Sequence, residues 1–220
     1  MTMPNDLTCS DCHQLNCYRH DRRYPDFCAT TALSEQDRGE LVELYRGDDL
    51  DGRMARAAAE VEGTYYGKTN RVEETIAFAR RIGVRRIGIA TCVGLIEETR
   101  TLVKILRLAG FEAVAALCKV GSVDKCEIGI GEGLKIKPSG FEACCNPILQ
   151  ARLLAKEGSE LNIIMGLCVG HDILFTRHSA APVTTLVVKD RVLGHNPVAA
   201  LYTTGSYNAR LLDEKRLRDL

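Results

Sequence analysis

Cysteine is the residue type in this chain whose number and spacing point to chemistry. Ten cysteines occur among 220 residues. Four of them have the spacing Cys9-x2-Cys12-x4-Cys17-x10-Cys28 near the N-terminus. Thiolates reach one metal centre only if the backbone between them is short and kinked, and a two-residue gap allows this. The segment therefore predicts a closed four-thiolate site for zinc or for an iron–sulfur cluster.

The spacing of this motif leaves the metal open. A zinc ribbon normally has two tight Cys-x2-Cys pairs, and this segment has one. Its gaps match ferredoxin spacing only loosely. His13 and His20 lie inside the motif and could replace a thiolate, although a solvated loop histidine is the simpler interpretation. The alternative to a metal site is a reduced or disulfide-bonded loop. Residues 7–31 contain almost no aliphatic side chains, so the segment needs a metal or a neighbouring surface to become ordered.

A second group of cysteines depends on the predicted sheet. Cys92, Cys118 and Cys168 each follow a predicted strand. The carboxyl ends of parallel strands share one edge of the sheet, which is where open α/β sheets bind ligands. Cys144 and Cys145 precede a predicted helix, so they face the same edge, and a helix N-terminus favours the thiolate form. The sequence thus predicts several thiols at one rim.

Three thiolates from separate segments suit a 4Fe–4S cluster with one open iron, or a zinc with one open position. The predicted ligands are Cys92, Cys145 and Cys168. Cys144 is a fourth candidate ligand or a sulfur carrier beside the cluster. Cys118 and Cys126 are weaker candidates, and Cys118 could be part of the core. The alternative for the whole group is that these cysteines act as small buried hydrophobic residues.

Other polar residues could complete this rim. His171 and Asp172 stand where a helix is predicted to begin, and His171 could act as an acid or base near neutral pH. Asp172 could equally be an ordinary carboxylate at a helix start. Gly94 and Gly170 each come two residues after a cysteine, where a glycine lets the backbone approach a bulky ligand closely. Lys119 could bind an anion.

The pattern of apolar residues and helix-capping signals predicts the elements that position these side chains. The predicted helices span 34–47, 51–62, 70–82, 95–108, 147–156, 173–177 and 198–202, and the predicted strands 86–90, 112–117, 162–167 and 183–189. Strands that alternate with helices predict an α/β fold: a mainly parallel, three-layer sheet of the Rossmann or flavodoxin type.

Three parts follow from this pattern. Residues 1–33 form a Cys-rich metal-binding segment, 34–83 a helical connector, and 84–220 the α/β domain. The stretch 120–144 has no clear period and is long enough to be functional. Its glycine run at 129–133 does not follow a strand and open a helix, so it is not a dinucleotide fingerprint.

Composition excludes several classes of function. Lys plus Arg number 29 and Asp plus Glu number 29, the chain has no Trp, and aromatics are 5 %. Such a chain has neither the basic field nor the stacking surface of a nucleic-acid-binding protein. No apolar run is long enough for a membrane span. The start lacks the pattern of a signal peptide, so we expect a cytoplasmic protein, in which many cysteines more often bind metal than form disulfides.

Several motifs together resemble a known family. They are the N-terminal four-cysteine motif, ATCVGL at 90–95, CNP at 145–147, GLCVGHD at 166–172 and KDRVLGHNP at 189–197. The chain resembles an uncharacterised family of predicted metal-binding proteins of bacteria and archaea, catalogued as a domain of unknown function. The resemblance covers nearly the whole chain and implies metal binding and a cytoplasmic setting, but no reaction. Relatives often have Pro after the last N-terminal cysteine, where this chain has Ala29.

These observations predict an iron–sulfur enzyme that acts on a small molecule at the sheet edge, with one or two 4Fe–4S clusters. Sulfur removal or transfer, or a redox step with an electron donor protein, are the predicted reactions. One alternative is a non-catalytic α/β protein stapled by zinc at the N-terminal motif. Another is a metal or redox sensor. The sequence does not predict the oligomeric state.

Overall fold

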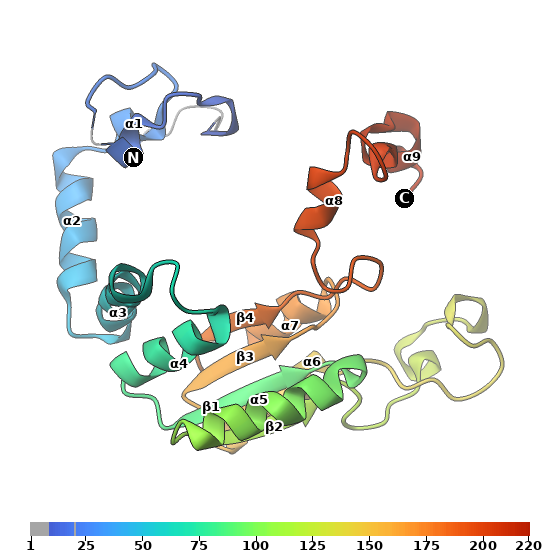
Figure 1. Cartoon of the computed structure of the whole chain (residues 1–220). Coiled ribbons are helices and arrows are strands. Elements are labelled where there is room, and N and C mark those ends of the chain that lie inside the picture. The colour runs from blue at the N-terminus through green and yellow to red at the C-terminus, as the bar shows by residue number, and fades with distance from the viewer. Residues whose placement is uncertain (1–8, 20) are drawn as a thin grey trace. The chain divides into compact units, whose positions relative to one another are not determined.

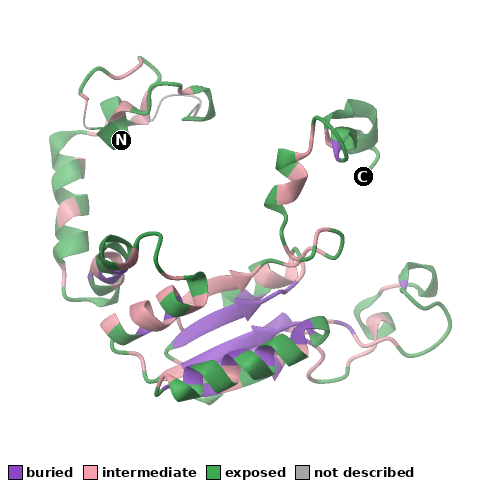
Figure 2. Cartoon of the chain, in the orientation of Figure 1, coloured by how far each residue is buried: buried purple, intermediate pink, exposed green. Residues whose placement is uncertain are grey.

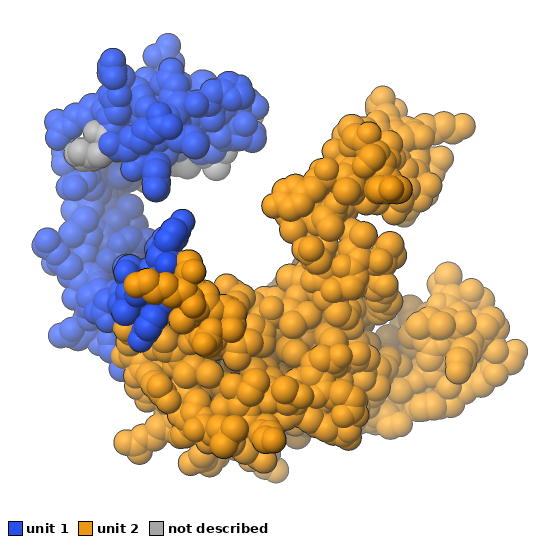
Figure 3. Space-filling view, viewed as in Figure 1, with its two compact units in different colours: residues 1–66 blue, residues 67–220 orange. Residues whose placement is uncertain are grey.

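The protein is described by a computed structural model that covers residues 9–19 and 21–220, so His20 lies outside the described residues. The chain divides into two compact units, residues 1–66 and residues 67–220 (Figure 3). The three-part division 1–33, 34–83 and 84–220 stays a prediction.

The first unit is helical. Its elements are the 3-10 helices η1 (Cys9–Asp11) and η2 (Ala29–Ala32), and the α-helices α1 (Asn16–Arg19), α2 (Glu35–Arg46) and α3 (Leu50–Tyr65). A capping box starts α2: Asp37 N donates to Ser34 Oγ (3.1 Å), and Ser34 N donates to the Asp37 carboxylate (3.3 Å). In the described part of this unit the buried residues all belong to α3. The cysteine segment therefore has no core of its own.

The second unit is built on a parallel sheet. Its strands are β1 (Arg86–Thr91), β2 (Glu112–Leu117), β3 (Leu161–Met165) and β4 (Val183–Val187), in the order β2-β1-β3-β4 (Figure 1). Its helices are α4 (Arg71–Arg81), α5 (Ile96–Leu108), α6 (Pro147–Lys156), α7 (His171–His178), α8 (Val198–Tyr202) and α9 (Glu214–Arg218), with short 3-10 helices η3 (Val93–Leu95), η4 (Lys125–Ile128), η5 (Glu132–Leu134) and η6 (Ala209–Leu212). All the pairings are parallel, so the predicted α/β class is confirmed.

Alternation along the strands divides the core into two layers. Ile87 and Ile89 of β1 pack with residues of α4 and α5 on one face of the sheet. Ala90 of β1 packs on the opposite face, together with Leu154 of α6 and Phe175 of α7. Successive strand residues point to opposite faces, so the sheet lies between two helical layers. Figure 2 shows that the buried residues are concentrated on the two central strands, β1 and β3.

The predicted boundaries differ from the structure mainly around β3 and α7. Strand β3 ends at Met165, whereas the sequence predicted a strand to position 167. Gly166 has φ +67°, a left-handed conformation that cannot continue a strand. Helix α7 begins at His171, two residues before the predicted start. Strand β4 ends at Val187, two residues earlier than predicted.

The stretch from 120 to 144 is an irregular segment, the excursion, in which the buried Lys135 side chain forms ion pairs. The Lys135 side chain is 1 % exposed and its Nζ lies 2.8 Å from Glu132 and 3.2 Å from Asp124. It also donates to the Gly140 carbonyl (2.7 Å). The glycine run at 129–133 starts after the end of η4 and continues into η5. It neither follows a strand nor opens an α-helix, which agrees with the rejection of a dinucleotide fingerprint.

Within the described ranges, every helix is too short or too polar to cross a membrane.

Candidate thiolate and metal site

Strand register places Cys92 and Cys118 beside each other. In the parallel pair β1–β2, Thr91 lies opposite Leu117, so the next residue on each strand is one of these cysteines. Cys118 N donates to Thr91 O (2.8 Å), which extends the ladder by one step. Both cysteines belong to the core layer on the α6 and α7 face. Neighbouring strands lie about 4.8 Å apart, so side chains at the same level on one face touch.

Cys145 reaches the same place from the start of helix α6. Asn146 caps this helix by accepting a hydrogen bond from Leu149 N (3.1 Å), and Pro147 occupies its first turn, as predicted. Asn146 N donates to the Cys118 carbonyl (2.8 Å), which ties the helix start to the end of β2. Side-chain hydrogen bonds then connect Cys118 with both Cys92 and Cys145. We call these three residues the sheet-edge cysteine cluster.

The three thiols of the cluster are not equivalent. The hydrogen bond with Cys118, the Gly94 backbone and Lys189 together lower the pKa of Cys92 to about 5, against the effect of burial. The hydrogen bond with Cys118 also lowers the pKa of Cys145 to about 5, helped by Lys119 and His171. The same bonds raise the pKa of Cys118, as does its burial. The surroundings therefore favour the thiolate form at Cys92 and Cys145 and the neutral thiol at Cys118.

Lys189 lies near Cys92 and beside two glycines. A Cβ on Gly94 would lie 3.9 Å from Lys189 Nζ, and a Cβ on Gly166 would lie 3.5 Å from Lys189 Cε, which are ordinary contacts. A Cβ on Gly166 would also lie 2.1 Å from Leu95, which would be a clash. Gly166 thus suits this position both for its left-handed conformation and for its lack of a side chain. In the sequence, Lys189 stands out only as part of a family motif.

Cys168 lies in the turn between β3 and α7. Its Sγ accepts a hydrogen bond from the Arg191 guanidinium (2.9 Å), and its carbonyl accepts hydrogen bonds from His171 N (2.9 Å) and Asp172 N (3.1 Å). Gly170, φ +87°, permits this turn. In the turn after β1, Gly94 also comes two residues after a cysteine, but its φ is not positive. The two turns therefore differ in backbone conformation. The structure thus places Cys168 next to a cation, at the same edge as the cluster.

His171 and Asp172 occupy the first turn of α7, next to this turn. His171 lies close to Cys145, and its Nδ1 is buried without a hydrogen-bond partner among the described residues. The Asp172 carboxylate accepts a hydrogen bond from the adjacent Ile173 N (2.8 Å). Within the described part of the chain, His171 therefore has a ring nitrogen without a protein partner, whereas Asp172 is engaged with the backbone.

A buried amide below the cluster went unnoticed in the sequence. Gln150 of α6 is fully buried, and its Nε2 donates to Thr91 O (3.1 Å) and to Ala116 O (2.7 Å). It therefore joins the ends of β1 and β2 immediately before the two strand-end cysteines. A glutamine in a helix carries no signal that would reveal this role, because the bonds depend on how α6 packs on the sheet.

Comparison with known proteins gives the family. Residues 28–186 match the family described as "Protein of unknown function (DUF1847)". The chain belongs to this family. A relative from Methanocaldococcus jannaschii, "Uncharacterized protein MJ0455", is 40% identical over 209 residues, which is 95% of this chain and 100% of the relative. No solved structure matches. The predicted resemblance to a domain of unknown function is confirmed, whereas metal binding stays a prediction.

The four cysteines of the N-terminal motif in this DUF1847 chain are accessible to solvent. Cys9 and Cys17 are exposed, Cys12 and Cys28 are partly exposed, and all ten cysteines are free thiols. Within residues 9–19 and 21–220, no three His, Cys, Asp or Glu side chains are gathered as ligands of one metal ion. A segment without a core gathers its ligands only when the ion binds, so the prediction of a site here stays a prediction.

Two further cysteines of the DUF1847 chain lie apart from the cluster contacts. Cys144 is buried, and its backbone N donates to the Val123 carbonyl (2.8 Å). Cys126 is exposed on the excursion, and its thiol donates to the Glu132 carboxylate (3.1 Å). Lys119 Nζ donates to the Ala143 carbonyl (2.6 Å) and so holds the segment that carries Cys144 and Cys145.

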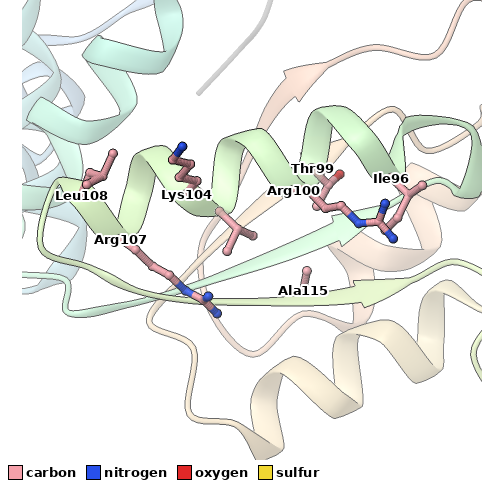
Figure 4. Close-up of a pocket in the computed structure, with 8 residues that line it drawn as sticks. Ile96, Thr99, Arg100, Lys104, Arg107, Leu108 and Ala115 are labelled. Carbon is pink, nitrogen blue, oxygen red and sulfur yellow. The ribbon is translucent and has the colours of Figure 1, made fainter.

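An open groove of about 500 Å³ lies away from the cysteines. It runs along α5 beside the edge strand β2 (Figure 4). Its lining is Ile96, Thr99, Arg100, Val103, Lys104, Arg107, Leu108 and Ala115. Arg107 extends from the helix along β2 and donates to the Ala113 carbonyl (3.2 Å). None of the predicted site residues lines this groove, so the cluster and not the groove is the candidate site.

Proposed function

We propose that this protein binds an iron–sulfur cluster through thiolates at the carboxyl edge of its sheet and acts there on a small molecule. The observation that carries the proposal is the cysteine cluster: Cys92, Cys118 and Cys145 come from three separate segments and meet at one edge. Lys119 and Lys189 lie beside its thiolates. An anionic metal centre needs such cations close by.

Thiolate sulfur is the ligand that iron–sulfur clusters take. The surroundings of Cys92 and Cys145 favour the thiolate form, and Cys168, at the same edge, would move in to supply a third sulfur when the cluster binds. Hydrogen bonds to sulfur tune such centres, and the Arg191 guanidinium and the Val93 backbone N–H donate to Cys168 and Cys118. When bound, the cluster would supply electron transfer or an open iron that acts as a Lewis acid.

The residues around the cluster suggest what the protein does with a substrate. We place the substrate over the sheet edge, where His171 can give or take a proton through its unpartnered nitrogen. Asp172 would keep the start of α7 in place. Cys144 would serve as a sulfur carrier. Sulfur removal or transfer, or a redox step with an electron donor protein, are the reactions of this class.

The N-terminal motif would hold a second centre. Cys9, Cys12, Cys17 and Cys28 could bind a further cluster for electron relay, or a structural zinc. The described residues before α3 contain no buried side chain, which favours a structural metal there. If this is the single metal of the chain, the protein is a zinc-stapled α/β protein or a metal sensor without catalysis.

The test is metal and acid-labile sulfide analysis with a visible spectrum on the full chain purified without oxygen. We expect brown protein, with more than about four iron atoms per chain if both sites hold clusters. Cys145→Ser and Cys168→Ser should each lose the sheet-edge centre and any activity, and Cys12→Ser should lose only the N-terminal centre. Cys126→Ser is the matched control and should change neither.

Two results would overturn the proposal. One is colourless protein with a single zinc that Cys145→Ser and Cys168→Ser retain. The other is iron whose amount depends only on the N-terminal cysteines. Either result would leave the sheet-edge sulfurs without a metal.

A further inference from the structure

Cys118 and Cys145 are neighbouring cysteines that differ in exposure: the thiol of Cys118 is buried and that of Cys145 is accessible. Cys118 is 1 % exposed, whereas Cys145 is partly exposed. The hydrogen bond from Asn146 N to the Cys118 carbonyl (2.8 Å) brings the two chain segments together. A disulfide requires Cα atoms about 4.4 to 6.8 Å apart, so the two segments must run side by side, as this hydrogen bond holds them. Cys145 also packs against the buried core cluster that contains Cys118.

We infer that Cys145 and Cys118 are the nucleophilic and resolving thiols of a dithiol site that reduces low-molecular-weight disulfides when no metal occupies the sheet edge. This activity is separate from the proposed cluster function, because a ligated Cys145 could not attack a disulfide. It is therefore a property of the metal-free chain. Its success or failure does not depend on whether iron binds.

The reaction consists of two exchange steps. The Cys145 thiolate attacks one sulfur of the small disulfide, the S–S bond breaks, and the first small thiolate leaves. Cys118 then transfers its proton to that thiolate and attacks the Cys145 sulfur of the mixed disulfide. A Cys118–Cys145 bond forms and the second small thiolate leaves. The protein dithiol is oxidised by two electrons, and the small disulfide is reduced to two thiols.

Exposure and neighbours assign these roles to the two thiols. Attack on a substrate requires an accessible sulfur, and Cys92 is only 8 % exposed. Cys145 is partly exposed, so a small disulfide can reach its sulfur. Cys118 is closed off from solvent and accepts a hydrogen bond from Val93 N (3.3 Å), so it can react only with a sulfur that is already in the site. The resolving role therefore belongs to Cys118.

The experiment uses the full chain, reduced, treated with a chelator, and equilibrated with mixtures of oxidised and reduced glutathione. Acid quenching, alkylation and peptide mass spectrometry then locate each disulfide. We expect a Cys118–Cys145 disulfide in the wild type. Cys118→Ala, which keeps the buried position apolar, should give about tenfold more glutathione on Cys145, because the resolving thiol is missing. Cys126→Ser is the control for an exposed thiol and should behave as the wild type.

Three outcomes would overturn the inference. Cys118 and Cys145 could both remain alkylated as free thiols at every glutathione ratio. The disulfide could join Cys92 and Cys118 instead. Cys118→Ala could carry no more glutathione on Cys145 than the wild type, with an unchanged circular dichroism spectrum that shows the variant to be folded. Iron analysis of the same preparation before chelation tests the proposed function independently.

Discussion

The two groups of cysteines in this chain are held in opposite ways. The N-terminal four lie in a segment of exposed and partly exposed residues, with short helical turns and no buried side chain. The sheet-edge cluster is positioned by strand register, a helix cap and a buried glutamine. The cysteines of the first group are linked only by their spacing in the sequence, whereas those of the second are brought together by tertiary packing. No packing therefore fixes the arrangement of the first group among the described residues, whereas packing alone arranges the second.

The largest difference between the two regions should appear on metal removal. A structural zinc site contributes about 10–16 kcal/mol in small peptides, so a segment without a core loses its order with its metal. We expect chelation of the full chain to raise proteolytic cleavage within residues 9–33 at least about tenfold. The sheet, residues 86–187, should stay protected by its core.

Two variants make this comparison sharper. Cys12→Ser should reproduce the effect of chelation on residues 9–33 without a chelator. Cys145→Ser should leave cleavage in that segment unchanged. Mass spectrometry of timed digests gives both rates. Equal cleavage before and after chelation would contradict the expectation that metal orders the N-terminal segment.

A smaller effect should follow from removing the amide that arranges the cluster. Gln150→Met keeps the volume but leaves the carbonyls of Thr91 and Ala116 without these donors. Each lost hydrogen bond costs about 0.5–1.5 kcal/mol, so we expect a loss of roughly 1–3 kcal/mol in the free energy of unfolding. Urea denaturation of the variant measures it. Arg152→Met, on the exposed side of the same helix, is the control and should change stability by less than about 0.5 kcal/mol.

The smallest effect concerns the charge beside Cys145. Because its pKa is about 5, its alkylation rate should level off above about pH 6, whereas the rate of Cys126, whose pKa Glu132 raises, should still climb above pH 9. Lys119→Met should slow Cys145 at least about twofold at pH 6, since losing a nearby cation raises a thiol pKa by about one unit or more. Lys119→Arg should restore the rate. A Cys145 rate that rises up to pH 9 would contradict the thiolate assignment.

The lowered pKa of Cys145 also determines whether the fold becomes more or less stable as the pH rises. Between pH 5 and 9 the folded chain has lost the Cys145 proton and the unfolded chain has kept it. Stability from this group therefore increases with pH through that window, is complete above the ordinary pKa of 9.0, and is lost as pH falls through 5.

Much of the fold could be predicted from the sequence. Strand β2 and helices α6 and α8 have the predicted bounds, because turns and caps such as Asn146–Pro147 mark them locally. The end of β3 was predicted two residues too late, because nothing in the apolar run 162–167 shows that Gly166 takes a left-handed conformation. A glycine also leaves room there for Leu95, which would clash with an added Cβ.

By itself, the sequence determined that four of the ten cysteines form an N-terminal motif and that Cys92, Cys118 and Cys168 each follow a predicted strand. Local patterns suffice for this, because strand and helix signals lie within a few residues of each cysteine. Only the tertiary structure decided that Cys118, taken as a weak candidate, packs with Cys92 and Cys145, and that Arg191 contacts Cys168. It also placed Gln150 against the ends of β1 and β2. Those contacts join segments far apart in the chain, and their distances depend on strand register and helix packing, which no local pattern encodes.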